Sequence, residues 1–402
     1  MKVLITAVGQ RTEHWTDLFD ALARQPDLDL TVVVADVSEL TIAGLEHCAQ
    51  RSAMRFHHVP HVLSERRSGH MASIVIRPGA LRKVGIERPD VVHIIGEAAY
   101  LSTRQIIRHR ASRWPDAVLT HYAAQNVVTR FPPPFPTFER MAYRAVQHML
   151  PITPAALAVL RAKGYRGGAT IVPLGVDAAR FRPVAGSAPA RPFTVGFVGR
   201  LEPHKGVADL IAAAERIDAD LLIVGRGSLA DQVGQAVQRR PGRVRHHDWL
   251  DHDQLAGVLA SMGALALPSV EVVQRNVVPW VGIPLREQFG RVLAEAMACG
   301  IPVVGSDVGE IGHVIGDAGL VFRAGDVDDL SAKLARLRDD RVLAGELGRR
   351  GRARVESELN WECIATTMRG VWGRLCSGGG AAGAPDMTLP APRSLEKMVT
   401  DA

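Results

Sequence analysis

The sequence predicts an α/β protein made of two doubly wound, Rossmann-like domains, and three observations support this. Short apolar runs alternate with amphipathic stretches along nearly the whole chain of 402 residues. The alternation stops once, at a Pro-, Ala- and Gly-rich segment over residues 184–192, and then starts again. Continuous apolar strands that alternate with helices are typical of a parallel sheet covered on both faces. At roughly 150 residues per domain, the length suggests two or three domains, and the single interruption favours two.

The apolar runs of residues 1–183 define the strands of the first domain. We expect strands at residues 3–8, 30–35, 91–95, 117–121, 150–153 and 171–173. Apolar residues at helical spacing predict a helix over 15–23, and Pro154 and Gly164 mark the start and end of another. We therefore assign residues 1–183 to the first domain and 184–192 to an interdomain linker.

The same pattern restarts in residues 193–360, which we assign to the second domain. We expect strands at residues 194–198, 221–224, 244–247, 264–267 and 302–304, with a helix over 206–216. In open sheets of this kind, ligands bind at the carboxyl ends of the strands. A further helix is expected over 361–375, and the Gly-, Ala- and Pro-rich residues 377–402 are expected to be disordered.

The composition is that of an ordinary globular protein, with 47% hydrophobic and 22% charged residues. No apolar run reaches the ~18 residues of a membrane span, and the start does not resemble a signal peptide, so we expect a cytoplasmic protein. The 4 cysteines show no C-x-x-C spacing, which argues against a zinc or redox pair. The formal net charge of +6 comes mainly from the first half, but no basic cluster suggests a nucleic-acid partner. Peripheral contact with an anionic membrane stays open.

The strongest chemical signal lies in residues 286–302. The apolar pattern predicts a helix that starts near Gly290 and ends at Gly300, because Pro302 cannot continue it. The unpaired N–H groups of its first turn form an anion site, and a glycine there lets a phosphate approach closely. Glu287 precedes the helix, and Glu295 lies a little over one turn into it. The two carboxylates could grip polyhydroxy groups on either side of a diphosphate.

This segment resembles the E-x7-E signature of the retaining glycosyltransferases of family 4. Those enzymes have the GT-B fold, in which two Rossmann-like domains enclose a cleft. In the family, the first Glu lies beside the transferred sugar and the second holds the ribose of the nucleotide. The resemblance implies these roles for Glu287 and Glu295. It also implies main-chain contacts to sugar and phosphate from Gln288, Phe289, Gly290 and Arg291.

A second signal lies at residues 196–206, Gly-Phe-Val-Gly-Arg-Leu-Glu-Pro-His-Lys-Gly. A strand there runs into a loop with two cations, Arg200 and Lys205. An arginine can grip phosphate oxygens with two hydrogen bonds, and a lysine supplies a point charge. The loop resembles the family element whose Arg and Lys neutralise the diphosphate leaving group, with one extra residue before the Lys.

Weaker resemblances concern segments 222–227, 246–250 and 307–311. With the two stronger signals, they imply a further set of donor-binding residues: Gly199, Gly225, Arg226, Trp249 and Leu250. His and Asp residues gather at 246–253, where a metal site is an alternative. Because GT-B enzymes need no bound metal, we expect neither a metal nor another cofactor besides the nucleotide-sugar co-substrate.

The first domain resembles the family more loosely. Residues 120–122 resemble the strand whose His faces the donor sugar, so His121, expected to end a strand at the cleft, is a further catalytic candidate. The family often has paired glycines after its first strand. Only Gly9 is present here, and we expect bulky polar side chains to contact the acceptor instead. The acceptor-side candidates are Gly9, Gln10, Arg11, Glu97, Gln125 and Asn126. In GT-B proteins a terminal helix returns to the first domain, which implies this for residues 361–375.

The resemblance implies an enzyme that moves a hexose-type sugar from a nucleotide-diphospho-sugar to a hydroxyl acceptor with retention. UDP is the first choice of nucleotide and GDP the second, and the acceptor is a small metabolite or a glycan. One alternative is an epimerase, hydrolase or phosphorylase-like enzyme acting on the same kind of donor. The intact pair Glu287 and Glu295 argues against the epimerase. Another alternative is a non-catalytic subunit that binds nucleotide sugars.

Overall fold

The computed structural model describes residues 1–64, 74–183, 192–275 and 282–378. The chain forms two compact units, which we describe separately. Unit 1 contains residues 1–173 together with the chain from 361 onward, and unit 2 contains residues 174–360. The predicted linker lies outside the described residues except for Pro192, as does the predicted tail beyond residue 378.

The division between the units comes earlier than the predicted boundary at residue 183. Residues 174–183 belong to unit 2 because they bond to its C-terminal part. The amide of Val176 donates to the carbonyl of Leu359 at 2.9 Å. The guanidinium of Arg352 donates to the carbonyls of Ala178 and Phe181 at 3.1 and 2.8 Å. These bonds, rather than the Pro-rich composition further on, set the boundary.

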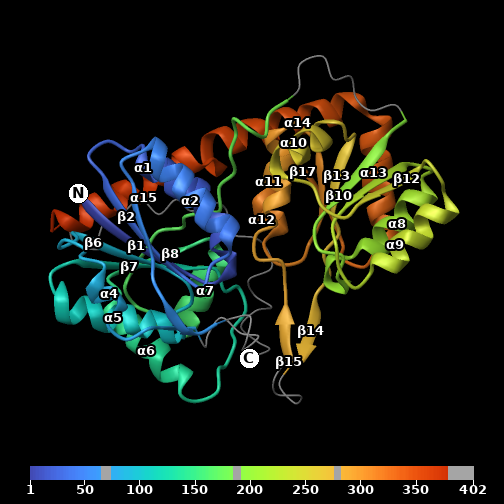
Figure 1. The fold of residues 1–402 in the computed structure, drawn as a ribbon. Coiled ribbons are helices and arrows are strands. Elements are labelled where there is room, and N and C mark those ends of the chain that lie inside the picture. Colours follow the sequence, from blue (N-terminus) through green and yellow to red (C-terminus); the bar gives the residue numbers. More distant parts are fainter. Residues whose placement is uncertain (65–73, 184–191, 276–281, 379–402) are drawn as a thin grey trace. The chain divides into compact units, whose positions relative to one another are not determined.

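Unit 1 is built on a seven-stranded parallel sheet in the order β3-β2-β1-β6-β7-β8-β9 (Figure 1). Its strands are β1 (Lys2–Val8), β2 (Asp29–Ala35), β3 (Arg55–His58), β6 (Val91–Ile95), β7 (Val118–Ala123), β8 (His148–Pro151) and β9 (Gly168–Ala169). A small antiparallel pair, β4 (His61–Leu63) and β5 (Val75–Ile76), lies outside it. The central strands β6 and β7 are buried along their whole length, as expected of a sheet covered on both faces.

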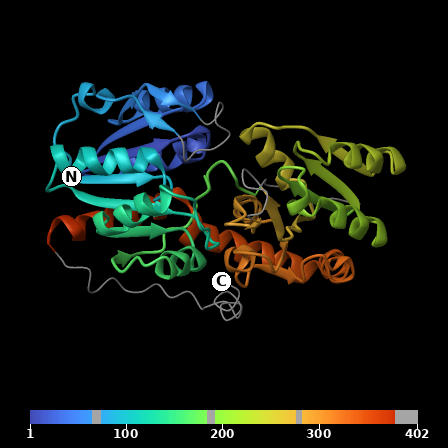
Figure 2. The same cartoon turned by 90° about the horizontal axis from the view of Figure 1, so that it is seen from below.

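Helices cover both faces of this sheet (Figures 1 and 2). One face carries α1 (Thr16–Ala23), α2 (Glu39–Arg51) and the C-terminal α15 (Trp361–Cys376). The other carries α5 (Leu101–Arg113), α6 (Phe135–Ala145) and α7 (Pro154–Ala162). Two short elements, the 3-10 helix η1 (Gln10–Trp15) and α4 (Ala80–Lys83), complete the unit. Helix α15 contacts α1 and β7, so the C-terminal helix belongs to unit 1.

Unit 2 repeats the pattern with a six-stranded parallel sheet in the order β12-β11-β10-β13-β16-β17. Its strands are β10 (Thr194–Val198), β11 (Asp220–Val224), β12 (Val244–His247), β13 (Ala264–Leu267), β16 (Val303–Ser306) and β17 (Gly319–Phe322). Between β13 and β16 the chain forms an antiparallel hairpin of β14 (Val272–Arg275) and β15 (Gly282–Leu285).

Helices α8 (Val207–Arg216), α9 (Ala230–Arg239) and α13 (Val327–Asp339) cover one face of the second sheet (Figure 1). Helices α10 (His252–Ala260), α11 (Arg291–Ala298) and α12 (Ile311–Ile315) cover the other. The 3-10 helix η3 (Pro203–Lys205) follows β10. Helix α14 (Arg341–Arg354) continues into the π-helix η4 (Val355–Leu359).

The predicted α/β class with two parallel sheets is confirmed, and most predicted strands lie within a residue or two of the observed ones. One prediction is wrong, because residues 171–173 form no strand. Their backbone still follows β8, since the amide of Val172 donates to the carbonyl of Pro151 at 2.8 Å. Strand β9 instead comes earlier, at Gly168–Ala169. Among the described residues, no helix has the length and apolar character needed to cross a membrane.

Candidate active site

The best-supported site lies in unit 2, where the strand order of the sheet reverses. Strands β10 and β13 are neighbours, but the chain leaves them toward opposite sides of the sheet. A doubly wound sheet opens at such a point, and ligands bind there. The turn that begins at Gly199 follows β10, and Pro268 and Ser269 follow β13.

Glycines allow the turns after β10 and β11 to touch through their backbones. The amide of Gly199 donates to the carbonyl of Val224 at 3.0 Å, and that of Leu201 donates to the carbonyl of Arg226 at 2.7 Å. A Cβ atom on Gly225 would lie 1.8 Å from the carbonyl oxygen of Gly199. No side chain fits at this position, so the predicted donor-side residues Gly199 and Gly225 lie together as expected.

The 3-10 helix η3 positions Lys205 beside the loop that follows β13. Gly206 ends this turn with φ +66, and a Cβ atom there would lie 1.8 Å from the carbonyl oxygen of Pro268. The amide of Val270 donates to the carbonyl of His204 at 2.9 Å. The two loops are therefore locked together, and Lys205 points at the residues that follow β13.

Glu287 forms the centre of the site. Lys205 Nζ lies 2.5 Å from Glu287 Oε2, and the Ser269 hydroxyl donates to the same oxygen at 3.1 Å. The side chains of Lys205 and Glu287 are only 16% and 13% exposed, so this ion pair is largely shielded from water. Ser306 in turn donates to the carbonyl of Ser269 at 2.6 Å. Ser269 is not among the predicted site residues. Its position just after the buried strand β13 could have indicated it, because ligands bind at the carboxyl ends of such strands.

The main chain around Glu287 is fixed by the loop after β16. The amide of Glu310 donates to the carbonyl of Glu287 at 3.1 Å. Gly309 has φ +61, and a Cβ atom there would lie 2.1 Å from the same carbonyl oxygen. The segment 307–311, predicted only as a weak resemblance, therefore supports the central carboxylate.

Helix α11 begins directly after Glu287, as the sequence predicts. Gly290 precedes its first residue with φ +76, and a Cβ atom there would lie 2.7 Å from Leu267 Cδ2. Phe289 is buried and anchors the turn, whereas Gln288 is exposed. The unpaired amides of the first helical turn and the helix dipole favour an anion at this end.

Glu295 lies inside α11 and is 6% exposed. The Arg291 guanidinium donates to Glu295 Oε1 at 3.1 Å and compensates its charge. A buried carboxylate with one charged partner keeps further acceptor capacity for hydroxyl groups. Arg291 and Glu295 thus lie one turn apart, on the helix whose start carries the anion site.

Other predicted donor-side residues make contacts of their own or are exposed. The guanidinium of Arg200 reaches the His204 ring at 3.5 Å, and Arg226 is exposed. Burial, and then the neighbouring charges of Lys205 and Arg200, lower the pKa of His204, so its ring is neutral near pH 7. Trp249 is 63% exposed and Leu250 is half-buried.

The loop after β1, which is predicted to contact the acceptor, is held by contacts within unit 1. Gly9 has φ +102, and its amide donates to the carbonyl of Ala35. The Gln10 amide group donates to the carbonyl and the carboxylate of Asp36 at 2.7 and 3.3 Å. Gln10 therefore holds the end of β2, and the structure gives it this fold-stabilising contact. The side chain of Arg11 lies outside the described part of the chain.

His121 does not end a strand, and this prediction is wrong. Strand β7 continues to Ala123, because its pairing with β8 extends two residues further. His121 is 1% exposed and lines a small cavity with Glu97, Gln125 and Tyr143. Burial lowers the pKa of His121 to about 4, so the ring is neutral near pH 7. Within the described residues, neither ring nitrogen has a side-chain hydrogen-bond partner.

The loop after β7 is held by a buried ion pair. Lys163 Nζ lies 2.6 Å from Glu139 Oε1 and donates to Gln125 Oε1 at 3.0 Å. The side chains of Lys163 and Glu139 are 7% and 14% exposed. Asn126, the next acceptor-side candidate, is buried. Gln125 thus lines the His121 cavity, and Asn126 follows it in the chain.

The arrangement in unit 2 can bind a polyanion next to a polyhydroxy group. Two cations and the start of α11 supply positive potential, and Glu287 and Glu295 supply hydroxyl acceptors. In the part of the chain that the structure describes, His, Cys, Asp and Glu side chains form no group of three or more that could hold a metal ion.

Comparisons with known proteins agree with this geometry. Residues 192–340 match the protein family described as Glycosyl transferases group 1. Glycogen synthase of Mycobacterium tuberculosis (strain CDC 1551 / Oshkosh) is 33% identical over 212 residues, or 50% of this chain and 48% of that protein. A GDP-mannose-dependent monoacylated alpha-(1-6)-phosphatidylinositol monomannoside mannosyltransferase of Corynebacterium glutamicum is 32% identical over 216 residues, covering 50% of this chain and 55% of that protein. The chain thus spans about half the length of the curated relatives it matches.

Two solved structures match over nearly the whole chain. Sucrose-phosphate synthase from Thermosynechococcus elongatus has a TM-score of 0.71 at 21% identity and covers 94% of this chain and 100% of its own. Anabaena Alr3699/HepE in complex with UDP has a TM-score of 0.70 at 16% identity, with 93% and 100% covered. These likenesses confirm the expected GT-B fold class. The similarity to the glycosyl transferases group 1 extends over residues 192–340.

Proposed function

We propose that this chain is a retaining glycosyltransferase. It moves a hexose-type sugar from a nucleotide-diphospho-sugar to a hydroxyl group of a small metabolite or glycan, in the cytoplasm and without a bound metal. The observation that supports this most directly is the contact of Lys205 and Ser269 with Glu287, immediately before the start of α11. That contact puts a cation, a carboxylate and a helix N-terminus within one loop cluster.

The proposal gives the cations the task of stabilising the leaving group. A departing nucleoside diphosphate gains negative charge as the sugar leaves. Fixed donors aimed at that charge lower the barrier, because they need no reorganisation during the reaction. We assign this stabilisation of the leaving group to Arg200, Lys205 and the first amides of α11. The Lys205 ammonium has three N–H donors and can contact Glu287 and a phosphate oxygen together.

The two carboxylates receive different tasks. Glu287 positions the transferred sugar and stabilises positive charge that develops on its ring. We assign it no nucleophilic attack, because its Oε2 already accepts from Lys205 and Ser269. Glu295, buried in α11 beside Arg291, accepts hydrogen bonds from the ribose hydroxyls of the nucleotide. Gly290 allows the diphosphate to approach the main chain.

UDP is the first nucleotide we propose, and GDP the second. Two solved structures with this fold contain UDP or UDP-glucose by their titles, and one relative is named as GDP-mannose-dependent. The acceptor is assigned to unit 1, whose Gln125 and Asn126 are ordered next to Glu97. The relatives' names include both a glycogen synthase and a mannosyltransferase that acts on a lipid, so both glycan and lipid-linked acceptors belong in the screen.

The first test measures the thermal stability of the purified chain with UDP, GDP, ADP and dTDP. A ligand that binds only the folded protein adds about 2.7 kcal/mol at 100 times its dissociation constant. We expect one nucleotide to raise Tm clearly. Sugar transfer or slow hydrolysis is then followed by NMR with that sugar series, where the anomeric coupling of the first product reports retention or inversion.

Replacing Glu287 tests the assignment of the site. Glu287→Gln should lower turnover about 10²–10³-fold, as removal of one stabilising group in an active site does, while the nucleotide-induced rise in Tm persists. Glu271→Gln is the matched control, since Glu271 is a carboxylate on the other side of the β14–β15 hairpin and pairs with Arg286. Equal turnover of Glu287→Gln and the unchanged protein would reject the role of Glu287.

A further inference from the structure

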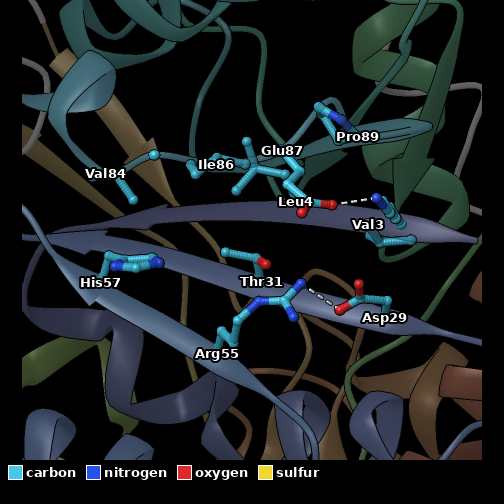
Figure 3. Close-up of a pocket in the computed structure, with 12 residues that line it drawn as sticks. Val3, Leu4, Asp29, Thr31, Arg55, His57, Val84, Ile86, Glu87 and Pro89 are labelled. Atoms are coloured by element: carbon cyan, nitrogen blue, oxygen red, sulfur yellow. Dashed lines mark hydrogen bonds and ion pairs between the residues drawn. The ribbon is translucent and has the colours of Figure 1, made fainter.

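Besides the cavity at His121, unit 1 has a pocket at the amino ends of its strands. It has a volume of about 270 Å³ and lies at the amino ends of β1, β2 and β3 (Figure 3). The predicted acceptor residues Gly9 and Gln10 are at the other end of the strands, since they follow the carboxyl end of β1. The volume is just below the ~300–1,000 Å³ of typical small-molecule sites. A ligand here would not overlap the residues that we assign to sugar transfer.

The strand register brings three polar side chains to one wall of this pocket. Leu4 is opposite Thr31, and Thr31 is opposite Arg55, across β1, β2 and β3. His57 lies two residues beyond Arg55 on β3, so its side chain projects from the same face. Figure 3 shows Thr31, Arg55 and His57 directed into one space. They come from paired strands, so the sheet fixes the backbone from which each side chain projects.

The opposite wall is the apolar segment 84–89, whose end is held to β1 by hydrogen bonds. Val84, Ile86 and Pro89 line the pocket from this side, and Gly85 between them has φ +63. Asp90, at the end of the segment, accepts from the amide of Lys2 at 2.7 Å and donates to its carbonyl at 2.9 Å. Lys2 also forms an ion pair with Glu87. The pocket is therefore a preformed space between a polar and an apolar wall.

The polar wall offers hydrogen-bond donors that described residues do not use, beside the carboxylate of Asp29. Arg55 uses Nη2 to contact Asp29 Oδ1 at 2.5 Å, and its Nε and Nη1 donors make no hydrogen bond with described residues. The same holds for the Thr31 hydroxyl, on a residue only 6% exposed, and for the ring nitrogens of His57. Burial and the charge of Arg55 lower the pKa of His57. A neutral imidazole retains one N–H donor.

We propose that this pocket binds the phosphoryl group of a small molecule through Arg55, His57 and Thr31. A phosphoryl group presents three strong acceptor oxygens, and an arginine with two unused N–H donors can bind two of them side by side. At the rim, Lys2 pairs with Glu87, just as Arg55 pairs with Asp29, so the pocket holds two cations and two carboxylates. The apolar wall of Val84 and Ile86 suits the carbon skeleton of a phosphorylated metabolite.

The proposal is tested on the full chain by titration with two probes, inorganic phosphate and a hexose 6-phosphate, followed by calorimetry and by the NMR signals of the His57 ring. We expect saturable binding of both probes and a shift of the His57 signals. Tighter binding of the hexose phosphate would identify a phosphorylated metabolite as the ligand, and equal binding would identify free phosphate.

Two variants and a control make the test specific. Arg55→Gln should weaken binding at least tenfold, because a charged hydrogen bond to the ligand is lost, and His57→Gln should weaken it less. Arg239→Gln is the control: Arg239 is 54% exposed and pairs with one carboxylate, much as Arg55 does at 56%. No saturable shift of His57, or unchanged affinity in Arg55→Gln, would overturn the proposal. Neither result depends on whether the chain transfers sugar.

Discussion

At the scale of single residues, close backbone approach decides the geometry of the proposed donor site. Gly225 and Gly309 leave no room for a Cβ atom, since each would place one within about 2 Å of a carbonyl oxygen. The oxygen that Gly309 faces belongs to Glu287, the centre of the site. An added methyl group must therefore displace the main chain that carries this carboxylate.

We predict that Gly309→Ala lowers both stability and turnover. The residue has φ +61, which costs a side chain roughly 1–3 kcal/mol, and the methyl group would also collide with the Glu287 carbonyl. Stability is measured by urea denaturation, and turnover with the nucleotide sugar identified above.

Gly325→Ala separates the two effects. Gly325 has a similar φ of +75, but a Cβ atom there would meet nothing within 4 Å. This control should lose stability through backbone strain alone and keep its turnover. If both variants lost turnover equally, the contact between Gly309 and Glu287 would have no special role.

The buried histidines of unit 1 give stability a predictable pH dependence. Burial lowers the pKa of His93 to about 3 and those of His121 and His148 to about 4. The unfolded chain binds these protons near pH 6.5, whereas the folded chain binds them only near pH 3–4. Between these values the unfolded state holds more protons, so stability falls as the pH drops from 6.5 toward 4.

We expect His121 alone to account for about 3 kcal/mol of this loss, since each unit of pKa shift corresponds to about 1.4 kcal/mol. Urea denaturation at pH 7.5, 6, 5 and 4.5 measures it. His121→Leu should flatten the pH dependence, and His47→Gln, which changes an exposed histidine, should leave it as it is. An unchanged slope in His121→Leu would show that His121 is solvated in the folded protein.

At the scale of elements, the C-terminal helix α15 is fixed to the sheet of unit 1 by a polar contact within an apolar interface. The Trp372 indole N–H donates to Thr120 Oγ1 at 3.1 Å, and His93 Nδ1 lies 2.8 Å from the same oxygen. Trp372, Met368 and Ala365 are fully buried on this face. The apolar residues supply the driving force, and the hydrogen bond sets the register of the helix.

We predict that Trp372→Phe costs about 1–2 kcal/mol of stability, because the Thr120 hydroxyl loses a partner inside the protein. Trp361→Phe on the same helix is the control. Trp361 is also buried, but its ring contacts Trp15 at 6.2 Å between centroids and carries no hydrogen bond to Thr120. Chemical denaturation of both variants gives the difference. Equal losses would mean that ring volume, rather than the hydrogen bond, holds α15.

Elements that the sequence failed to predict share a physical cause. Strand β3 is only partly buried and mixes Arg, Phe and His, so no apolar run marks it. The hairpin of β14 and β15 interrupts the chain between Ser269 and Glu287, and its apolar residues show no clear period in the sequence. By contrast, β10 and β13 match their predicted bounds, because each is a short apolar run that ends at a turn signal.

At the scale of the whole molecule, the two units differ in how the chain builds them. Unit 2 is one continuous segment, whereas unit 1 needs residues from both ends of the chain. Fragment 174–360 therefore contains every described element of its own sheet and helices. Fragment 1–173 lacks α15 and would expose the sheet face that Trp372 and Met368 cover.

We predict that fragment 174–360 folds alone and keeps its nucleotide-induced rise in Tm, because Lys205, Glu287 and Glu295 all lie within it. Fragment 1–173 should be destabilised and should bind a dye for exposed apolar surface. Adding residues 361–378 back in trans, as a peptide, should reduce the dye signal. Cooperative unfolding of fragment 1–173 at the Tm of the full chain would contradict this.

The sequence alone determined the α/β class, the two-part organisation and the residues around α11, because apolar period and glycine or proline punctuation are local properties of the chain. It also indicated Arg200, Lys205, Glu287 and Glu295 through spacing and resemblance. It placed His121 at a strand end, where the structure shows a residue inside a buried strand, and it did not indicate the contact of Gln10 with Asp36. Only the tertiary structure showed the environments of His121 and Gln10, the boundary between the units at residue 173, and the pocket of Arg55 and His57. Burial, pairing and close approach depend on residues far apart in the chain, which no local pattern records.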